Sequence, residues 1–218
     1  MQHGLFITLE GVDGTGKSTQ LRLLAQYLKK RGLAVRTTRE PGGTNVGEQI
    51  RKILLASTTT ELAPLAELAL MYAARAQHLQ EVIRPALAQG EIVLSDRYND
   101  ASFAYQGYGR GLGVKTVRAF DRIVCARTQP DLTIVLDLPP RLSLKRAQGR
   151  ESRRKSKQQR FELQGMRFHK RVRDGYLAIA RREPGRVKVV HAEQPVAEVQ
   201  AEIRRLVDAF LTRRRKRF

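Results

Sequence analysis

The stretch GVDGTGKST at positions 11–19 restricts the fold of this 218-residue chain more than any other stretch. It follows the apolar run LFITLE (5–10), and a helical pattern begins near Lys17. Gly11 to Ser18 have the spacing G-x-x-x-x-G-K-[ST], in the strand-then-helix context that a phosphate-binding loop requires. Glycines let such a backbone wrap around a phosphate, and its N–H groups then point into one concavity at the N-terminus of a helix.

The sequence therefore predicts a nucleoside triphosphate site on this loop, which we call the phosphate loop (residues 11–19). Lys17 can reach the terminal phosphates, and the Ser18 hydroxyl can bind Mg²⁺. The residues expected around the phosphates are Gly11, Val12, Asp13, Gly14, Thr15, Gly16, Lys17, Ser18 and Thr19. A triphosphate site alone names no reaction. The reaction could be that of an ATPase, a GTPase or a kinase. The absence of a guanine-reading Asn-Lys-x-Asp motif disfavours a GTPase, and the length of the chain disfavours a helicase or a transporter.

Apolar strand patterns alternate with helical patterns along the chain. Strands are expected at 5–10, 33–40, 91–98, 131–138 and 187–193. Helices are expected from about Lys17 to Arg31 and at 46–56, 61–89, 114–128, 141–148, 161–183 and 195–212, with a long loop after residue 98. This alternation predicts an α/β fold, a doubly wound parallel sheet of about five strands with helices on both faces. We expect one domain over residues 1–212, with a mobile basic lid at about 149–160 and a basic tail at 213–218.

The net charge of +20 is concentrated in two segments. Residues 141–173 have a net charge of +11 and residues 213–218 a net charge of +5, whereas the rest of the chain is close to balanced. A local basic segment can bind nucleic acid, an acidic surface or a small polyanionic substrate. Few aromatic residues lie between the basic ones, so stacking platforms for single strands are scarce. A nucleic-acid-binding protein stays the alternative to an enzyme, and weak non-specific binding by the lid and tail is expected at most.

Composition also bears on the compartment. The single cysteine, Cys125, lies in an apolar stripe and cannot form an internal disulfide, which favours a reducing compartment. No apolar run approaches the roughly 20 residues of a membrane span. We therefore expect a cytoplasmic protein without a membrane partner.

Charged residues follow the second and third expected strands. Arg39 begins the sequence REPGG, and Asp96 and Arg97 begin DRY. Ligands of doubly wound sheets bind beyond the carboxyl ends of the strands, so these side chains should share a crevice with the phosphate loop. Two arginines besides Lys17 exceed what one triphosphate needs, and they suit a second phosphorylated substrate.

Taken together, these stretches closely resemble the bacterial thymidylate kinases, which transfer the γ-phosphate of ATP to dTMP in dTTP synthesis. The motifs EGVDGTGKST, REPGGT, YAARAQH, DRY, AYQG, PDLTIVLD and RFE occur in the family's order from Phe6 to about Glu193. The resemblance implies a fold of the P-loop NTPase type, ATP as phosphoryl donor, Mg²⁺ as cofactor and dTDP as product. A kinase for dUMP or dCMP is a related alternative.

The resemblance also implies roles around the acceptor phosphate. Asp13 matches the carboxylate that meets the 3′-hydroxyl of dTMP and helps to organise Mg²⁺. Arg97 matches the arginine that holds the dTMP phosphate, and Arg39 is expected to share that work. Asp96 resembles the acid beside Mg²⁺ and the acceptor phosphate, although it could instead orient Arg97.

Further residues match the nucleoside pocket of the family. Tyr72 is aligned with the aromatic residue that stacks on thymine, and Arg75 with the arginine that bonds the base edge. Ser102 and Gln106 match polar residues near the base, and Tyr105 is expected under the sugar, where it would hinder a ribose 2′-hydroxyl. Stacking fixes the plane of the base, and the polar groups then select it.

Transfer of a phosphoryl group needs positive charge on its oxygens, often from an arginine. The phosphate loop contains no arginine, so we expect this residue from the lid. Arg150 and Arg154 are favoured, and Arg153 and Arg160 are further candidates. With Asp13, Lys17 and Arg97, the favoured pair completes the predicted catalytic set.

The resemblance implies a homodimer as well, with the expected helix 114–128 as one interface candidate. Its apolar stripe could equally belong to the core. Two positions depart from the family pattern, Ala101 and Gln159, where a serine and an aspartate are usual. The expected effect is on local hydrogen bonding and on ATP affinity.

Overall fold

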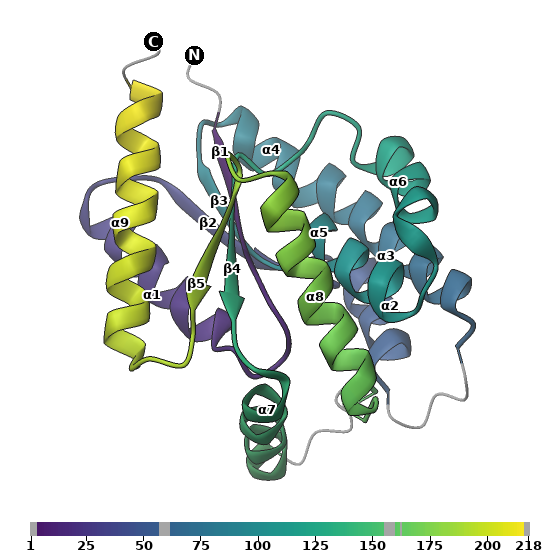
Figure 1. Ribbon diagram of the computed structural model, residues 1–218. Coiled ribbons are helices and arrows are strands. Elements are labelled where there is room, and N and C mark those ends of the chain that lie inside the picture. Colours follow the sequence, from purple (N-terminus) through teal and green to yellow (C-terminus); the bar gives the residue numbers. More distant parts are fainter. Residues whose placement is uncertain (1–3, 57–61, 155–159, 162, 216–218) are drawn as a thin grey trace.

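A five-stranded parallel sheet forms the centre of the computed structural model, which describes residues 4–56, 62–154, 160–161 and 163–215 (Figure 1). The strand order is β2-β3-β1-β4-β5. The strands are β1 (Leu5–Glu10), β2 (Val35–Arg39), β3 (Ile92–Asp96), β4 (Leu132–Asp137) and β5 (Val187–His191). Asp96 pairs in register with Leu9 on one side and with Arg39 on the other. The carboxyl ends of the three strands β2, β3 and β1 therefore lie level, as the doubly wound interpretation predicted.

Helices cover both faces of the sheet (Figure 1). One face is covered by α1 (Lys17–Lys30) and α9 (Val196–Arg215), which contact each other. The other face is covered by elements that include α3 (Pro64–His78), α4 (Arg84–Ala88), α5 (Asn99–Ser102) and α8 (Met166–Arg182). Farther from the sheet, α2 (Asn45–Leu55) and α6 (Gly113–Val124) pack on α3, and α7 (Pro140–Arg154) follows β4. No helix in the described ranges is both long and apolar enough to span a membrane.

The alternation of side chains along β1 separates two hydrophobic cores. Ile7 and Leu9 point into the core shared with α1 and α9, whereas Phe6 points into the core shared with α3 and α8. Successive side chains of a strand point to opposite faces, so Glu10 lies on the same face as Phe6. The polar end of β1 is thereby directed toward α8.

The chain after β3 is helical rather than the expected loop. α5 is followed by a wide π-helical segment, η2 (Phe103–Gly109), which packs against α8. Phe103, Ala104 and Tyr105 are buried there. Tertiary packing thus overrides the local preference of a glycine-rich stretch, and π-helical segments occur frequently at functional sites.

Other boundaries also differ from expectation. The expected helix 61–89 is divided into α3, a π-helical turn η1 (Leu79–Ile83) and α4, and α6 ends at Val124. The helix expected at 141–148 continues as α7 through Arg154, so the first part of the expected lid is helical. Residues 155–159 lie outside the described residues. α9 extends into the expected tail as far as Arg215, and Arg214 donates from Nη1 to Asp131 Oδ1 at 2.9 Å.

Candidate active site

The phosphate loop connects β1 to α1 in the conformation that its glycines allow. Gly11, Gly14 and Gly16 have φ values of 130°, 84° and 91°, a region that favours glycine. Lys17 is buried, and its Nζ donates to Gly11 O at 3.1 Å and to Val12 O at 2.9 Å. Burial, followed by the nearby Arg97 cation, lowers the pKa of Lys17 to about 8. An anion in the loop would supply the counter-charge that this buried ammonium group needs.

The other loop residues are placed as predicted around the start of α1. Thr15 is buried and donates from its hydroxyl to Val12 O at 3.0 Å, which closes the turn. Ser18 and Thr19 lie exposed in the first turn of α1, which contains no acidic side chain. The carboxylates near this helix end therefore come from outside α1.

Gly14 and Gly16 allow a matched test of this conformation. A Cβ at Gly14 would lie 2.1 Å from the Ser143 carbonyl oxygen of α7, whereas a Cβ at Gly16 would have no heavy atom within 4 Å. Both residues have positive φ, so an alanine at either position should introduce backbone strain. Gly14→Ala should in addition introduce a clash with the backbone of α7, whereas Gly16→Ala should not. We expect losses in free energy of unfolding of about 3 kcal/mol or more and about 1 kcal/mol, respectively. Urea unfolding without nucleotide measures both, and equal losses would contradict the contact between Gly14 and α7.

A cavity of about 320 Å³ opens beside the phosphate loop at the carboxyl ends of β2 and β3. Its walls come from the loop, from α2, α3, α5 and η2, and from Phe161. The sequence-predicted site residues that line it are Asp13, Lys17, Ser18, Arg39, Arg75, Asp96, Arg97, Ser102, Tyr105 and Gln106. The structure therefore brings the predicted donor and acceptor sites together in one cavity.

Arg97 has the largest set of contacts at the cavity wall. Its Nη2 donates to Asp13 Oδ1 at 2.7 Å and to Tyr105 Oη at 3.0 Å. Its Nη1 donates to Gly11 O at 2.8 Å and to Tyr176 Oη at 3.1 Å. The residue has a φ of 73°, a strained conformation for a residue other than glycine that is typically found at functional sites.

Asp13 is held as a carboxylate by these neighbours. Burial would raise its pKa, but the charges of Arg97 and Lys17 outweigh that effect and hold the pKa well below its usual range. Tyr105 adds a hydrogen bond from its hydroxyl to Asp13 Oδ2 at 3.0 Å. Asp13 therefore faces Arg97 and Tyr105 in this structure.

A Mg²⁺ ion fits the oxygen atoms between the phosphate loop and β3. The Ser18 hydroxyl donates to Asp96 Oδ2 at 2.6 Å, so a hydroxyl and a carboxylate already lie together. Within the described ranges, no group of three or more His, Cys, Asp or Glu side chains could hold a metal alone. This donor set suits Mg²⁺, which is usually bound by one or two carboxylates together with substrate phosphates.

Arg39 and Arg51 form the outer rim of the cavity. Arg39 is exposed and donates from Nη2 to both Glu48 carboxylate oxygens at 3.0 Å. Arg51 of α2 donates from Nη1 to Pro41 O at 2.8 Å, and burial together with the Arg39 charge lowers its pKa. Arg51 is not among the residues predicted from the sequence, although its place on a helix directly after the PGG turn is a usable signal.

Arg75 lies at the far end of the cavity, in a buried polar cluster. Its Nε donates to Glu40 Oε2 at 2.7 Å, and its Nη2 donates to Tyr98 O at 3.0 Å and to Ser102 Oγ at 3.1 Å. Glu40 also contacts His78 Nδ1 at 3.0 Å. The Nη1 of Arg75 is buried without a hydrogen-bond partner in the described residues. An unpaired guanidinium nitrogen at a cavity wall is suited to a ligand acceptor.

Tyr72 is not where the stacking prediction placed it. It is 1% exposed and does not line the cavity, because its position on α3 turns the ring toward Phe120 and the backbone of α6. The preceding residue, Met71, lines the cavity instead. One residue on a helix corresponds to a rotation of about 100°. The prediction that Tyr72 stacks on a base is therefore wrong for this structure.

The lid arginines are only partly described. The backbone of α7 places Arg150 and Arg154 on one helix, and their side chains lie outside the described residues. Arg160 is buried, with Nη2 donating to Glu67 Oε2 at 2.6 Å and Nε to Leu54 O at 2.6 Å. Both contacts anchor Arg160 beside Phe161, so it has a structural role here.

Comparison with known proteins identifies the family. The model of the thymidylate kinase family matches residues 9–203. The chain belongs to the thymidylate kinase family. It is similar to the thymidylate kinase of Trichlorobacter lovleyi, 48% identical over 210 residues that cover 96% of this chain and 98% of that protein. It is 49% identical to the thymidylate kinase of Pseudomonas syringae pv. tomato over 208 residues, 95% of this chain and 97% of that protein.

A solved thymidylate kinase shares the fold. The crystal structure of the thymidylate kinase from Ehrlichia chaffeensis has a TM-score of 0.76 and 33% sequence identity, and the match covers 94% of this chain and 99% of that one. The family resemblance seen in the sequence motifs is thereby confirmed over nearly the whole chain.

Proposed function

We propose that this protein performs the reaction of its family, the ATP-dependent phosphorylation of dTMP to dTDP, at the cavity described above. One observation supports this most strongly. A single cavity is lined by the phosphate loop, by Arg97 and by Arg75. A triphosphate on the loop and a nucleoside monophosphate in the cavity would then present their phosphates to each other.

The donor side of the proposed site consists of the phosphate loop. The backbone N–H groups and the N-terminus of α1 bind the triphosphate, and Lys17 turns its ammonium group from Gly11 O and Val12 O to the phosphates. Ser18 and Asp96 supply the protein oxygens for Mg²⁺. When bound, that ion would neutralise charge on the phosphate oxygens.

The acceptor phosphate is proposed to lie against Arg97, with Arg51 and Arg39 on its outer side. Four hydrogen bonds hold the Arg97 guanidinium group in place and occupy its Nη hydrogens. A bound phosphate would accept from Nε–H or replace one of the present acceptors. The lowered pKa of Arg51 reflects burial and the closeness of other cations, a strain that a bound dianion would relieve. Arg51 is thus added to the set that the sequence predicted.

The base is proposed to lie between Met71 and Phe161, which both line the cavity. Methionine adapts its shape and makes favourable contacts with aromatic rings. Arg75, Ser102 and Gln106 lie at the same end and can select the base by hydrogen bonds, and Tyr105 faces the sugar position beside Asp13.

The chemistry needs positioning and charge neutralisation more than proton transfer. A phosphate monoester has a second pKa of about 6, so the attacking oxygen of dTMP is ionised at neutral pH and no general base is needed. Lys17 and Arg97 hold the two phosphates, and we propose that Arg150 or Arg154 neutralises charge on the migrating group. Closure of the basic lid over the site would exclude water.

The reaction is tested by offering the purified protein ATP, Mg²⁺ and one acceptor at a time, chosen from dTMP, dUMP, dCMP, AMP and GMP, and measuring ADP. We expect strong ADP formation with dTMP and at least about tenfold less with each other acceptor, because the polar groups around a base discriminate by hydrogen bonding. A preference for AMP or dCMP would keep the kinase and remove the base assignment. No acceptor-dependent ADP would contradict the proposed function.

We further propose a homodimer in the cytoplasm. The outward face of α6 supports an interface, since Ile123 is 81% exposed there and Val117 of the same helix is buried.

The only cysteine, Cys125, is buried, and burial raises its thiol pKa to about 12, which suits an inert core residue.

A further inference from the structure

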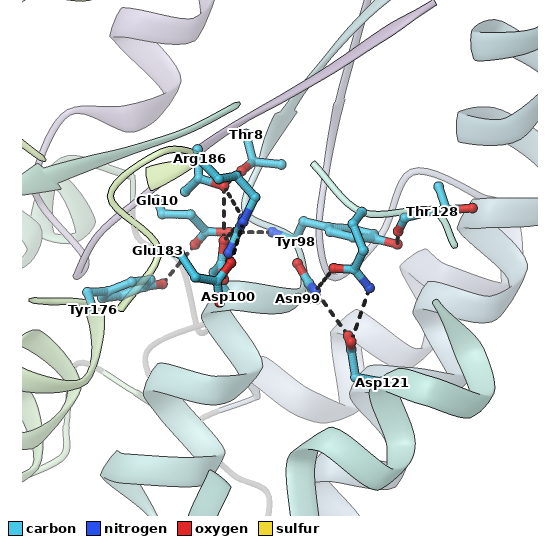
Figure 2. A network of polar contacts seen from close by, with 12 residues as sticks. Thr8, Glu10, Tyr98, Asn99, Asp100, Asp121, Thr128, Tyr176, Glu183 and Arg186 are labelled. Carbon is cyan, nitrogen blue, oxygen red and sulfur yellow. Dashed lines mark hydrogen bonds and ion pairs between the residues drawn. The ribbon is translucent and has the colours of Figure 1, made fainter. Parts of the chain in front are cut away.

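Arg97 is also joined to a buried chain of hydrogen bonds for which the family motifs imply no role. Glu10, the last residue of β1, is fully buried between two tyrosines (Figure 2). Its Oε1 accepts from the Tyr98 backbone N–H at 2.7 Å, and its Oε2 accepts from the Tyr176 hydroxyl at 2.9 Å. Tyr176, on α8, in turn accepts from Arg97 Nη1 at 3.1 Å.

This chain holds Arg97 at two places. Tyr98 N–H belongs to the peptide that follows Arg97, so Glu10 fixes the backbone of a residue with a φ of 73°. The same backbone is held by Arg97 N–H donating to Leu9 O at 3.0 Å and by Ser95 Oγ donating to Arg97 O at 2.7 Å. Through Tyr176, the second carboxylate oxygen of Glu10 also fixes the guanidinium end. Neither Glu10 nor Tyr176 lines the cavity.

We propose that Glu10 and Tyr176 are positioning residues that aim the Arg97 guanidinium group at the acceptor phosphate. The inference rests on the proposed function, in which Arg97 holds that phosphate. Tyr176 suits this role because its ring is packed in the core among η2 and α8, with its centroid 6.4 Å from that of Tyr105, and cannot follow a displaced arginine. A tyrosine hydroxyl that donates its hydrogen to a carboxylate can still accept a hydrogen bond from a second group. In this structure that second group is Arg97 Nη1.

The proposal makes a specific kinetic prediction for Tyr176→Phe. The variant keeps the ring and removes the hydroxyl, so Arg97 loses one acceptor and keeps Gly11 O, Asp13 and Tyr105. We expect KM for dTMP to rise about tenfold, which corresponds to the loss of one hydrogen bond to a charged group. KM for ATP should stay within about twofold of the native value. Glu10→Gln should also raise KM for dTMP. When the glutamine oxygen accepts from the Tyr98 backbone N–H, its NH₂ group faces Tyr176 and cannot accept the hydrogen bond from the Tyr176 hydroxyl.

Thr8→Val is the matched control for loss of a buried hydrogen bond on the same strand. Thr8 lies two residues before Glu10 and does not line the cavity, and its hydroxyl contacts the Thr133 hydroxyl at 2.9 Å. This variant should lower thermal stability without changing KM for either substrate. A merely structural effect of Tyr176→Phe would resemble this control.

The decisive measurement repeats Tyr176→Phe in an Arg97→Ala background. If Tyr176 acts through Arg97, the substitution should lower kcat/KM for dTMP about tenfold in the native background and leave it unchanged when Arg97 is absent. Equal losses in both backgrounds, or an unchanged KM for dTMP in Tyr176→Phe, would overturn the inference. An unchanged KM for dTMP in Glu10→Gln would remove Glu10 from it. Failure of the proposed function is distinct, since the native protein would then not turn over dTMP.

Discussion

Replacing Lys17 with alanine will lower phosphoryl transfer from ATP to dTMP by about 10³-fold or more, because the substitution removes the buried cation that we propose to bind the terminal phosphates. The hydrogen bonds of Lys17 go to backbone carbonyl oxygens of its own loop, Gly11 O and Val12 O, and Asp13, which also feels its charge, keeps its ion pair with Arg97. Its loss therefore leaves no buried charge unpaired, and the fold should persist. Steady-state ADP formation at saturating dTMP measures the loss, and circular dichroism checks the fold.

Lys30→Ala is the control for this variant. Lys30 lies exposed in the last turn of the same helix, far from the loop. It should retain native turnover. Turnover in Lys17→Ala that matches this control would remove the assignment of residues 11–19 as the phosphate-binding loop.

The second large effect is expected for Arg97→Ala. The variant loses the guanidinium group that we propose to hold the acceptor phosphate, and we expect a rise of about 10²- to 10³-fold in KM for dTMP. KM for ATP should change far less than KM for dTMP, because Arg97 contacts the phosphate loop only at Gly11 O and Asp13, and Lys17 and the loop N–H groups are retained. Initial rates over a grid of both substrate concentrations give the two constants from one experiment.

Two companion variants sharpen the interpretation. Arg97→Lys keeps a charge and loses the fork of donors, so it should lie between the native protein and Arg97→Ala. Arg36→Ala removes an exposed arginine of β2 that pairs with Glu91 and should leave both KM values unchanged. Equal effects of Arg97→Ala on KM for ATP and for dTMP would mean that Arg97 does not mark the acceptor site.

The features that the sequence predicted well are those with a local cause. The phosphate loop depends on glycines and a lysine within one short stretch, and the position of β3 follows from the continuous apolar run Ile-Val-Leu. Parallel pairing then brings Arg39, Asp96 and Asp13 to one edge of the sheet, as the cavity confirms. The family was recognisable because several such stretches occur in a fixed order.

The features that were missed depend on contacts distant in sequence. Tyr72 and Met71 are adjacent, and only the packing of α3 against α6 decides which of them faces the cavity. The contact between Glu10 and Tyr176 spans 166 positions, and no local pattern predicts it. Arg160 was a candidate for catalysis by its motif, yet the buried carboxylate of Glu67 holds it.

The central claim is direct transfer between two nucleotides that share the cavity, and the fate of the γ-phosphate tests it most directly. The protein is incubated with γ-radiolabelled ATP, Mg²⁺ and dTMP, and the labelled products are separated. The account predicts that the label appears in dTDP in step with ADP, and that almost none is released as inorganic phosphate. Label released as inorganic phosphate at a rate independent of dTMP would contradict it.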